Sequence, residues 1–134
     1  MSTLPSRNYG LHLMLDGYGA DSKLLHDVSH IFNVLDSLPA LIGMRKIGFP
    51  HMAKFEESDI AGVSGIIMIM ESHISIHTYS LKEFLTADVY SCKEFDTQKA
   101  IDYLQASFKI KQSDVQLVKR GVKFPVANVR ETAH

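Results

Sequence analysis

The chain has 134 residues, of which 46% are hydrophobic and 22% charged, with a formal net charge of −1 and one cysteine. This balance is ordinary for a globular protein, and the length suits one domain spanning residues 1–134, long enough to bury about two-thirds of its unfolded surface. The small charge, with no basic face, excludes a nucleic-acid binder that tracks phosphates. No apolar run reaches the ~20 residues of a membrane span, and residues 1–8 lack a secretory signal pattern. Because Cys92 has no second cysteine to pair with, we expect a cytoplasmic protein.

The first predicted elements are a strand and a helix. Residues 9–16 alternate between apolar and polar side chains between two glycines, which predicts a strand. Asp21 is a good helix N-cap, and apolar residues then recur at steps of three and four. These positions are Leu24, Leu25, Val28, Ile31, Phe32, Leu35 and Leu38. The spacing predicts one helix that Pro39 stops.

The central stretch, residues 62–79, is flanked by further strands. Residues 44–55 predict a strand bent near Pro50, followed by a polar turn over residues 56–61. Residues 64–70 form an apolar run typical of a strand buried on both faces.

The second half of the central stretch, residues 73–79, alternates strictly. Ile74 and Ile76 point one way, and His73, Ser75 and His77 point the other.

The remaining elements are a strand, a helix and a short strand. Residues 84–92 predict a strand, and Asp96 or Thr97 caps a second helix. Its apolar side carries Ala100, Ile101, Leu104 and Phe108. Residues 115–119 predict a last strand, and residues 121–134 have no clear period.

This order of elements favours an α+β fold. Two amphipathic helices can cover one face of a mainly antiparallel sheet, which gives a two-layer sandwich. The other face also needs a cover, because the middle strands are apolar on both sides, and a second copy is the simplest candidate. We therefore expect a homodimer formed through the sheet side.

Several common kinds of site are disfavoured. His73 and His77 have the spacing of a helical metal pair, but they lie in a predicted strand, so we predict no metal. No Gly-x-Ser-x-Gly elbow is present, and Gly62-Val63-Ser64-Gly65 is too short and apolar for a phosphate loop. A lone cysteine such as Cys92 is most often a small buried hydrophobe.

Taken together, Ser64, Ser72, His77 and Cys92 favour a more definite hypothesis. At these residues the chain resembles the prokaryotic S-adenosylmethionine decarboxylase family of self-processing, pyruvoyl-dependent enzymes. The resembling segments are Gly10-Leu11-His12 through Asp16, Gly62-Val63-Ser64-Gly65, Glu71-Ser72-His73-Ile74-Ser75-Ile76-His77-Thr78 and Asp88-Val89-Tyr90-Ser91-Cys92. The likeness covers about residues 9–120, and the Glu-Ser-His-x-Ser-x-His-Thr run is highly specific.

The resemblance implies a role for each of these residues. Ser72 would attack the carbonyl of Glu71, converting the peptide link to an ester, and elimination and hydrolysis would cut the chain between Glu71 and Ser72. The second fragment would begin with the cofactor, a pyruvoyl group made from Ser72. Ser64 and His77 match positions that assist this cleavage, His77 as the proton-transfer group. Cys92 matches the family's general acid.

The chemistry has a physical logic of its own. A ketone condenses with a substrate amine to an imine, a Schiff base that accepts the electron pair released with carbon dioxide. A partly buried thiol near an imidazole is a reasonable proton donor, and serine is unreactive until neighbours polarise its target. On a regular strand Ser72 and His77 would face opposite ways, so we predict a turn or distortion at the Glu71–Ser72 junction.

The chain departs from the family pattern where substrate binds. Leu81 replaces a glutamate that in the family holds the ribose hydroxyls of S-adenosylmethionine. Glu83 is a candidate substitute for that carboxylate. Phe55 is the best candidate for the adenine-stacking aromatic, although residues 56–59 look like an insertion after it, and Glu71 is a further candidate for substrate binding.

The sequence therefore predicts a cytoplasmic pyruvoyl-dependent decarboxylase of polyamine biosynthesis, acting on a small amino-acid-type substrate. S-adenosylmethionine is the first choice. The alternatives are ornithine or arginine as substrate, or a non-catalytic homologue that regulates an active partner.

Overall fold

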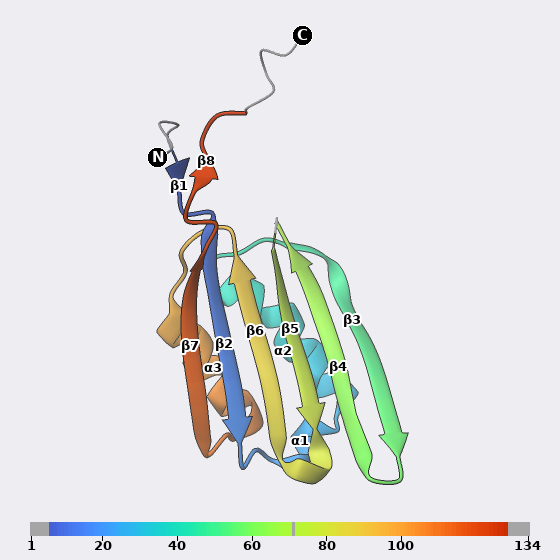
Figure 1. Ribbon diagram of the computed structural model, residues 1–134. Helices are drawn as coiled ribbons and strands as arrows, with labels where there is room; N and C mark the ends of the chain where they lie inside the picture. Colours follow the sequence, from blue (N-terminus) through green and yellow to red (C-terminus); the bar gives the residue numbers. More distant parts are fainter. Residues whose placement is uncertain (1–5, 71, 129–134) are drawn as a thin grey trace.

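The computed structural model describes residues 6–70 and 72–128. Within these residues, six strands form an antiparallel sheet in the order β3-β4-β5-β6-β2-β7, and all the α-helices lie behind one face of it (Figure 1). In chain order the elements are β1 (Ser6–Arg7), β2 (Gly10–Tyr18), α1 (Ser22–Leu25), α2 (Val28–Leu41), β3 (Lys46–Glu57), β4 (Ile60–Ile69), β5 (Ser72–Tyr79), η1 (Ser80–Lys82), β6 (Phe84–Ser91), α3 (Thr97–Phe108), β7 (Gln112–Arg120) and β8 (Phe124–Pro125). The predicted α+β two-layer sandwich is confirmed. None of the helices in the described ranges is long and apolar enough to cross a membrane.

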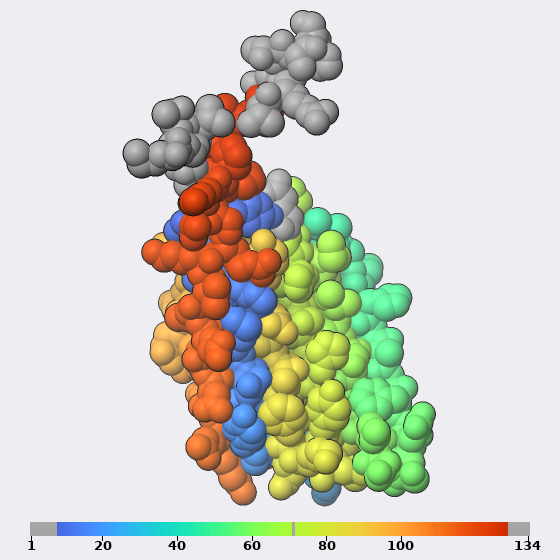
Figure 2. All heavy atoms as spheres, in the orientation of Figure 1, coloured from blue at the N-terminus to red at the C-terminus, as the bar shows by residue number. Residues whose placement is uncertain are grey.

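The hydrophobic core lies between the sheet and the helices. Along β5, Ile74, Ile76 and Thr78 are buried on the helix side, as the alternation predicted. Other core side chains with no exposed surface include Leu13, Leu15, Leu35, Leu38, Val89, Leu104 and Phe108. The opposite side of the sheet, here called the open face, is made of strand side chains with no described helix over it (Figure 2).

Strand β4 is buried on one face only, so the prediction that both faces are buried is wrong for a single chain. Val63, Ile67 and Ile69 are buried against the helices. Met68 is 54% exposed, and Ile66 also lies on the open face. The sequence shows that both sets are apolar, but the helix layer covers only one of them.

The first predicted helix is in fact two helices. Asp21 caps α1, as predicted, but Asp27 caps α2 by accepting a hydrogen bond from the backbone of His30. Two capping aspartates within one turn and a half allow the chain to restart the helix at a new angle. Pro39 lies inside α2, whose last residue is Leu41, so the prediction that Pro39 stops the helix is wrong, although the helix ends only two residues later.

The strands are longer than the sequence predicted. Residues 56–61 were expected to form a turn, yet only Ser58 and Asp59 do so, and their neighbours continue β3 and β4. The bend near Pro50 is confirmed as a register shift between Ile47 and His51. The small β1–β8 ladder was not predicted, since two-residue strands have no readable period.

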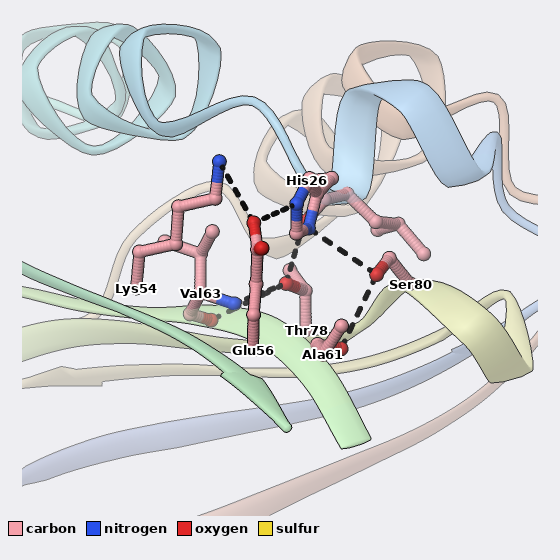
Figure 3. Close-up of polar contacts among 8 residues, drawn as sticks. His26, Lys54, Glu56, Ala61, Val63, Thr78 and Ser80 are labelled. Carbon is pink, nitrogen blue, oxygen red and sulfur yellow. Dashed lines mark hydrogen bonds and ion pairs between the residues drawn. The ribbon is translucent and has the colours of Figure 1, made fainter. Parts of the chain in front are cut away.

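A polar cluster fixes α1 to the end of the β3–β4 hairpin (Figure 3). His26 Nε2 lies 2.7 Å from Glu56 Oε1, and Lys54 Nζ lies 3.5 Å from the same oxygen. Thr78 Oγ1 donates to the Leu25 carbonyl at 2.6 Å. Ser80 Oγ donates to the Ala61 carbonyl and lies 3.4 Å from His26 Nδ1. The hydrogen bonds from His26 and Lys54 lower the pKa of Glu56 below its usual 4.5.

This cluster predicts a pH-dependent effect of Glu56→Gln. A carboxyl group with a lowered pKa stabilises the folded state above its unfolded pKa, and this contribution is lost as the pH falls through the folded value. The variant should therefore melt below the wild type at neutral pH, by a small margin because the site is exposed. The difference should shrink toward zero below pH 4.5, the usual value for this carboxyl, when thermal melts are compared across pH. Glu57→Gln is the control, and an equal loss in both variants would contradict the prediction.

Candidate functional site

Ser64 and His77 form a hydrogen-bonded pair on the open face. They are directly opposite one another on β4 and β5, and Ser64 Oγ lies 2.8 Å from His77 Nδ1. An imidazole that accepts at Nδ1 can take a proton from the serine or return one. Both residues were predicted as site residues, and the structure brings these two together.

Glycines shape the backbone on either side of Ser64. A side chain at Gly62 would begin 1.9 Å from the Thr78 carbonyl oxygen, and one at Gly65 would begin 2.6 Å from a methyl group of Leu35. Only glycine permits these approaches. These two close approaches keep the backbone on either side of Ser64 close to its neighbours.

A shallow pocket of about 220 Å³ opens beside the Ser64–His77 pair. Its lining is mostly apolar and comprises His51, Met52, Ala53, Ser64, Gly65, Ile66, Ser75 and His77. A mostly apolar hollow with a few convergent polar groups is the usual form of a small-molecule site.

Ser72 is the first residue of β5 and lies directly after the β4–β5 turn. Met70 is a turn residue and Ile69 pairs with Ser72, whereas the predicted turn or distortion at the Glu71–Ser72 junction involves Glu71. Glu71 lies outside the described residues. Ser72 is only 5% exposed, and its Oγ has no hydrogen-bond partner among the described residues. A buried hydroxyl without a partner is unusual and costs free energy, so it calls for an explanation.

Cys92 lies against the same turn. It follows β6, and its Sγ is 3.5 Å from the Met70 carbonyl oxygen. The half-buried thiol also lines a hollow of about 210 Å³, together with Asn8, Tyr9, Gly10, Leu11, Lys93, Glu94 and Lys119. Cys92 is therefore not the fully buried hydrophobe that a lone cysteine most often is.

The predicted site residues thus form two groups within one chain. Ser72 and Cys92, the turn group, lie at the β4–β5 turn, and Ser64 and His77, the central pair, lie farther along the strands. Five residues of extended strand separate the Cα atoms of Ser72 and His77 by about 17 Å. The two side chains also point to opposite faces, because β5 runs from Ser72 to His77 without a register shift, and no distortion within this strand turns them the same way. A single chain does not bring the four residues together.

A row of hydrogen bonds that the sequence did not predict crosses four strands of the open face. Ser75 Oγ donates to Asp88 Oδ2 at 3.4 Å, and Asp88 Oδ1 lies 2.9 Å from His12 Nε2. Arg120 Nη1 lies 3.2 Å from His12 Nδ1, and its guanidinium stacks over Tyr90. Because arginine only donates, His12 Nδ1 must accept and Nε2–H must donate to Asp88.

The candidate substrate residues lie near the far end of β5. Phe55 packs edge-on to Tyr79, with ring centroids 6.5 Å apart. Leu81 in η1 is 64% exposed and helps line a hollow of about 110 Å³ with the apolar Ile60, Ala61 and Tyr79 and the charged Asp59 and Lys82. Glu83 lines a different hollow, among Lys23, Lys109 and Lys111, so the carboxylate proposed as a substitute does not share the hollow of Leu81.

No group of three or more His, Cys, Asp or Glu side chains able to hold a metal ion occurs within residues 6–70 and 72–128. His73 instead packs edge-on against Tyr90, with ring centroids 5.6 Å apart.

Comparisons with known proteins agree with this geometry. The profile of the family described as S-adenosylmethionine decarboxylase matches residues 11–121. An S-adenosylmethionine decarboxylase proenzyme from Pyrococcus furiosus is 34% identical over 115 residues, 85% of this chain and 80% of that protein. One from Aquifex aeolicus is 31% identical over 127 residues, 94% of this chain and 91% of that protein. The crystal structure of the adenosylmethionine decarboxylase from Aquifex aeolicus matches with a TM-score of 0.77 at 29% identity, covering 92% of this chain and 99% of that chain.

The two-layer fold is thus shared with an adenosylmethionine decarboxylase, and the relatives by sequence are decarboxylases named as proenzymes. The chain belongs to the S-adenosylmethionine decarboxylase family.

Proposed function

We propose that the chain is the proenzyme of a pyruvoyl-dependent decarboxylase that breaks its own backbone between Glu71 and Ser72. The observation that supports this most directly is the Ser72 hydroxyl, which is buried at a turn and has no partner among the described residues. A hydroxyl committed to no hydrogen bond is available to attack the neighbouring carbonyl.

The proposed cleavage balances as follows. Ser72 Oγ adds to the Glu71 carbonyl carbon, the C–N bond breaks, and an ester and a free amine result. Removal of the Ser72 α-proton then breaks the Cβ–O bond and releases residues 1–71 with a carboxylate end. Water replaces the nitrogen of the remaining unsaturated residue, which leaves a ketone and releases ammonia.

Each remaining residue has a role set by its chemistry. The Ser64–His77 pair would transfer protons during cleavage, since an imidazole beside a hydroxyl is a proton shuttle at neutral pH. The pyruvoyl group would supply a carbonyl that takes up the electron pair left by departing carbon dioxide. Cys92 Sγ–H, half-buried beside the turn, would return a proton to the substrate carbon.

We also propose that the working unit is a homodimer of processed chains, with each site built from both. The turn group and the central pair of one chain are about 17 Å apart, whereas proton transfer needs hydrogen-bond contact. Stacking two open faces antiparallel would bring the central pair of one chain to the open-face side of the other chain's turn, beside its backbone, whereas the Ser72 hydroxyl is on the helix side. Exposed Ile66, Met68, Met70 and Val118 would be covered by such stacking. A cytoplasmic location suits a chain with one cysteine.

Intact mass after denaturation tests the cleavage. We expect two fragments, residues 1–71 and 72–134, the second lacking one NH₃ relative to a serine terminus. Ser72→Ala should remain uncut, since alanine has no hydroxyl to attack with. An uncut wild-type chain that still releases carbon dioxide would contradict the proposal, and an uncut, inactive chain would favour the regulatory homologue.

Complementation tests the shared site. When Ser72→Ala and His77→Ala chains are co-expressed in equal amounts, each mixed dimer contains one site with an intact Ser72 and the partner's intact His77. Up to about half of the His77→Ala chains should then be cut, as measured on a denaturing gel. The control is His77→Ala expressed alone, which should be cut much more slowly. No gain on co-expression would exclude a site shared between chains.

The substrate has two candidates. S-adenosylmethionine has the support of the family, because that substrate is in the names of the relatives. Ornithine or arginine is favoured by Leu81, because a leucine side chain cannot accept hydrogen bonds from ribose hydroxyls. Unpaired hydroxyl groups in a closed site cost about 1–3 kcal/mol.

Leu81→Glu separates these candidates. If S-adenosylmethionine is the substrate, the variant should raise kcat/KM for it by about 5- to 150-fold, the equivalent of 1–3 kcal/mol. Carbon dioxide release is measured from all three substrates, with Leu81→Gln as the uncharged control. Wild-type activity on ornithine or arginine alone would overturn the first choice.

A further inference from the structure

We propose that β7 is an interaction edge that pairs antiparallel with β7 of a second copy of this chain. Strand β7 is the last strand of the sheet and forms its left edge in Figures 1 and 2, and no described strand pairs with its outer side. An outermost strand leaves half of its backbone N–H and C=O groups without sheet partners, which makes it a template for another strand.

The two edges of the sheet differ in how they are protected. Strand β3 has a register shift between Ile47 and His51, with Gly48 and Pro50 inside the shifted segment. A bulge and a proline both discourage pairing with another chain. Strand β7 has neither, and its nine residues pair with β2 in unbroken register from Gln112 to Arg120. The long flat edge is therefore β7.

Two rows of apolar side chains begin in the core on β2 and extend onto β7, where they are partly exposed to solvent. Leu117 is opposite the fully buried Leu13, and Val115 is opposite the fully buried Leu15, all on the helix side of the sheet. Nevertheless Leu117 is 51% and Val115 is 38% exposed. Another strand beside β7 would continue these two apolar rows and bury their ends.

The charges on β7 favour its own copy, in antiparallel orientation. Asp114 lies in the first half of the strand, and Lys119 and Arg120 end it. Antiparallel pairing places the acidic half of one strand beside the basic end of the other, whereas parallel pairing would place like charges together. Antiparallel pairing of identical strands also has two-fold symmetry, which closes the assembly after two copies.

This contact is separate from the dimer through the open face. Val115 and Leu117 are on the helix side, so stacking of open faces does not cover them. If both contacts form, the assembly has four chains. If only the edge contact forms, it has two.

Sedimentation velocity over a concentration series tests the edge contact in the full-length chain. Val115→Lys and Leu117→Lys place a charge where apolar rows would meet, and both positions are exposed enough to accept lysine in the monomer. The matched control is Leu41→Lys at the end of α2, since Leu41 is 39% exposed and Val115 is 38% exposed. We expect the largest species of the wild type and of Leu41→Lys to have twice the mass of that of the β7 variants. Equal masses in all four proteins would overturn the proposal, and so would an equal loss in the control.

Hydrogen exchange of the wild type gives a second measurement that needs no variant. Amides of β7 should exchange more rapidly on dilution, because dissociation frees its outer edge, while amides of β3 should not change. Exchange in β7 that is independent of concentration would also overturn the proposal.

Discussion

The alternation of β5 is the constraint on which the rest of the site depends. Burial of Ile74 and Ile76 against the helices stabilises the fold by roughly 1.5–3 kcal/mol for each side chain. A slip of one residue would move both isoleucines to the open face and His77 into the core. The apolar residues therefore hold the polar ones in place, and the position of the imidazole follows from core packing.

Because of the same constraint, the candidate site residues lie in two separate groups along the β4–β5 hairpin. Ser72 starts β5 beside Cys92, and His77 lies midway along the strand beside Ser64. No rotamer change in a rigid sheet can close a gap of about 17 Å. The proposed homodimer would complete a site that uses all four residues. The exposed apolar residues of the open face provide a physical reason for that second chain to bind.

The row of hydrogen bonds from Ser75 to Arg120 connects side chains of four strands across the open face. The row joins β5, β6, β2 and β7, and Asp88 and His12 are its central residues. The contacts are compatible with one another when His12 accepts at Nδ1 and donates from Nε2. His12 and Asp88 belong to two of the segments in which the sequence resembles the decarboxylase family. Because the row ends at Arg120 on the edge strand β7, the same hydrogen bonds connect the open face to that edge.

The sequence by itself determined what depends on neighbours along the chain: the cap at Asp21, a helix start at Asp96 or Thr97, of which Asp96 is the cap, and the strands of the hairpin. Each follows from a period or a local hydrogen bond. Where the local signals compete, as at Pro39 and at residues 56–61, the prediction was wrong, because packing extends helices and strands past weak stop signals. Only the tertiary structure decided which apolar face of β4 is covered and that His12 meets Asp88 and Arg120. Those partners are 76 and 108 residues apart in the chain, and contact between them depends on the order of strands in the sheet, which no local period encodes.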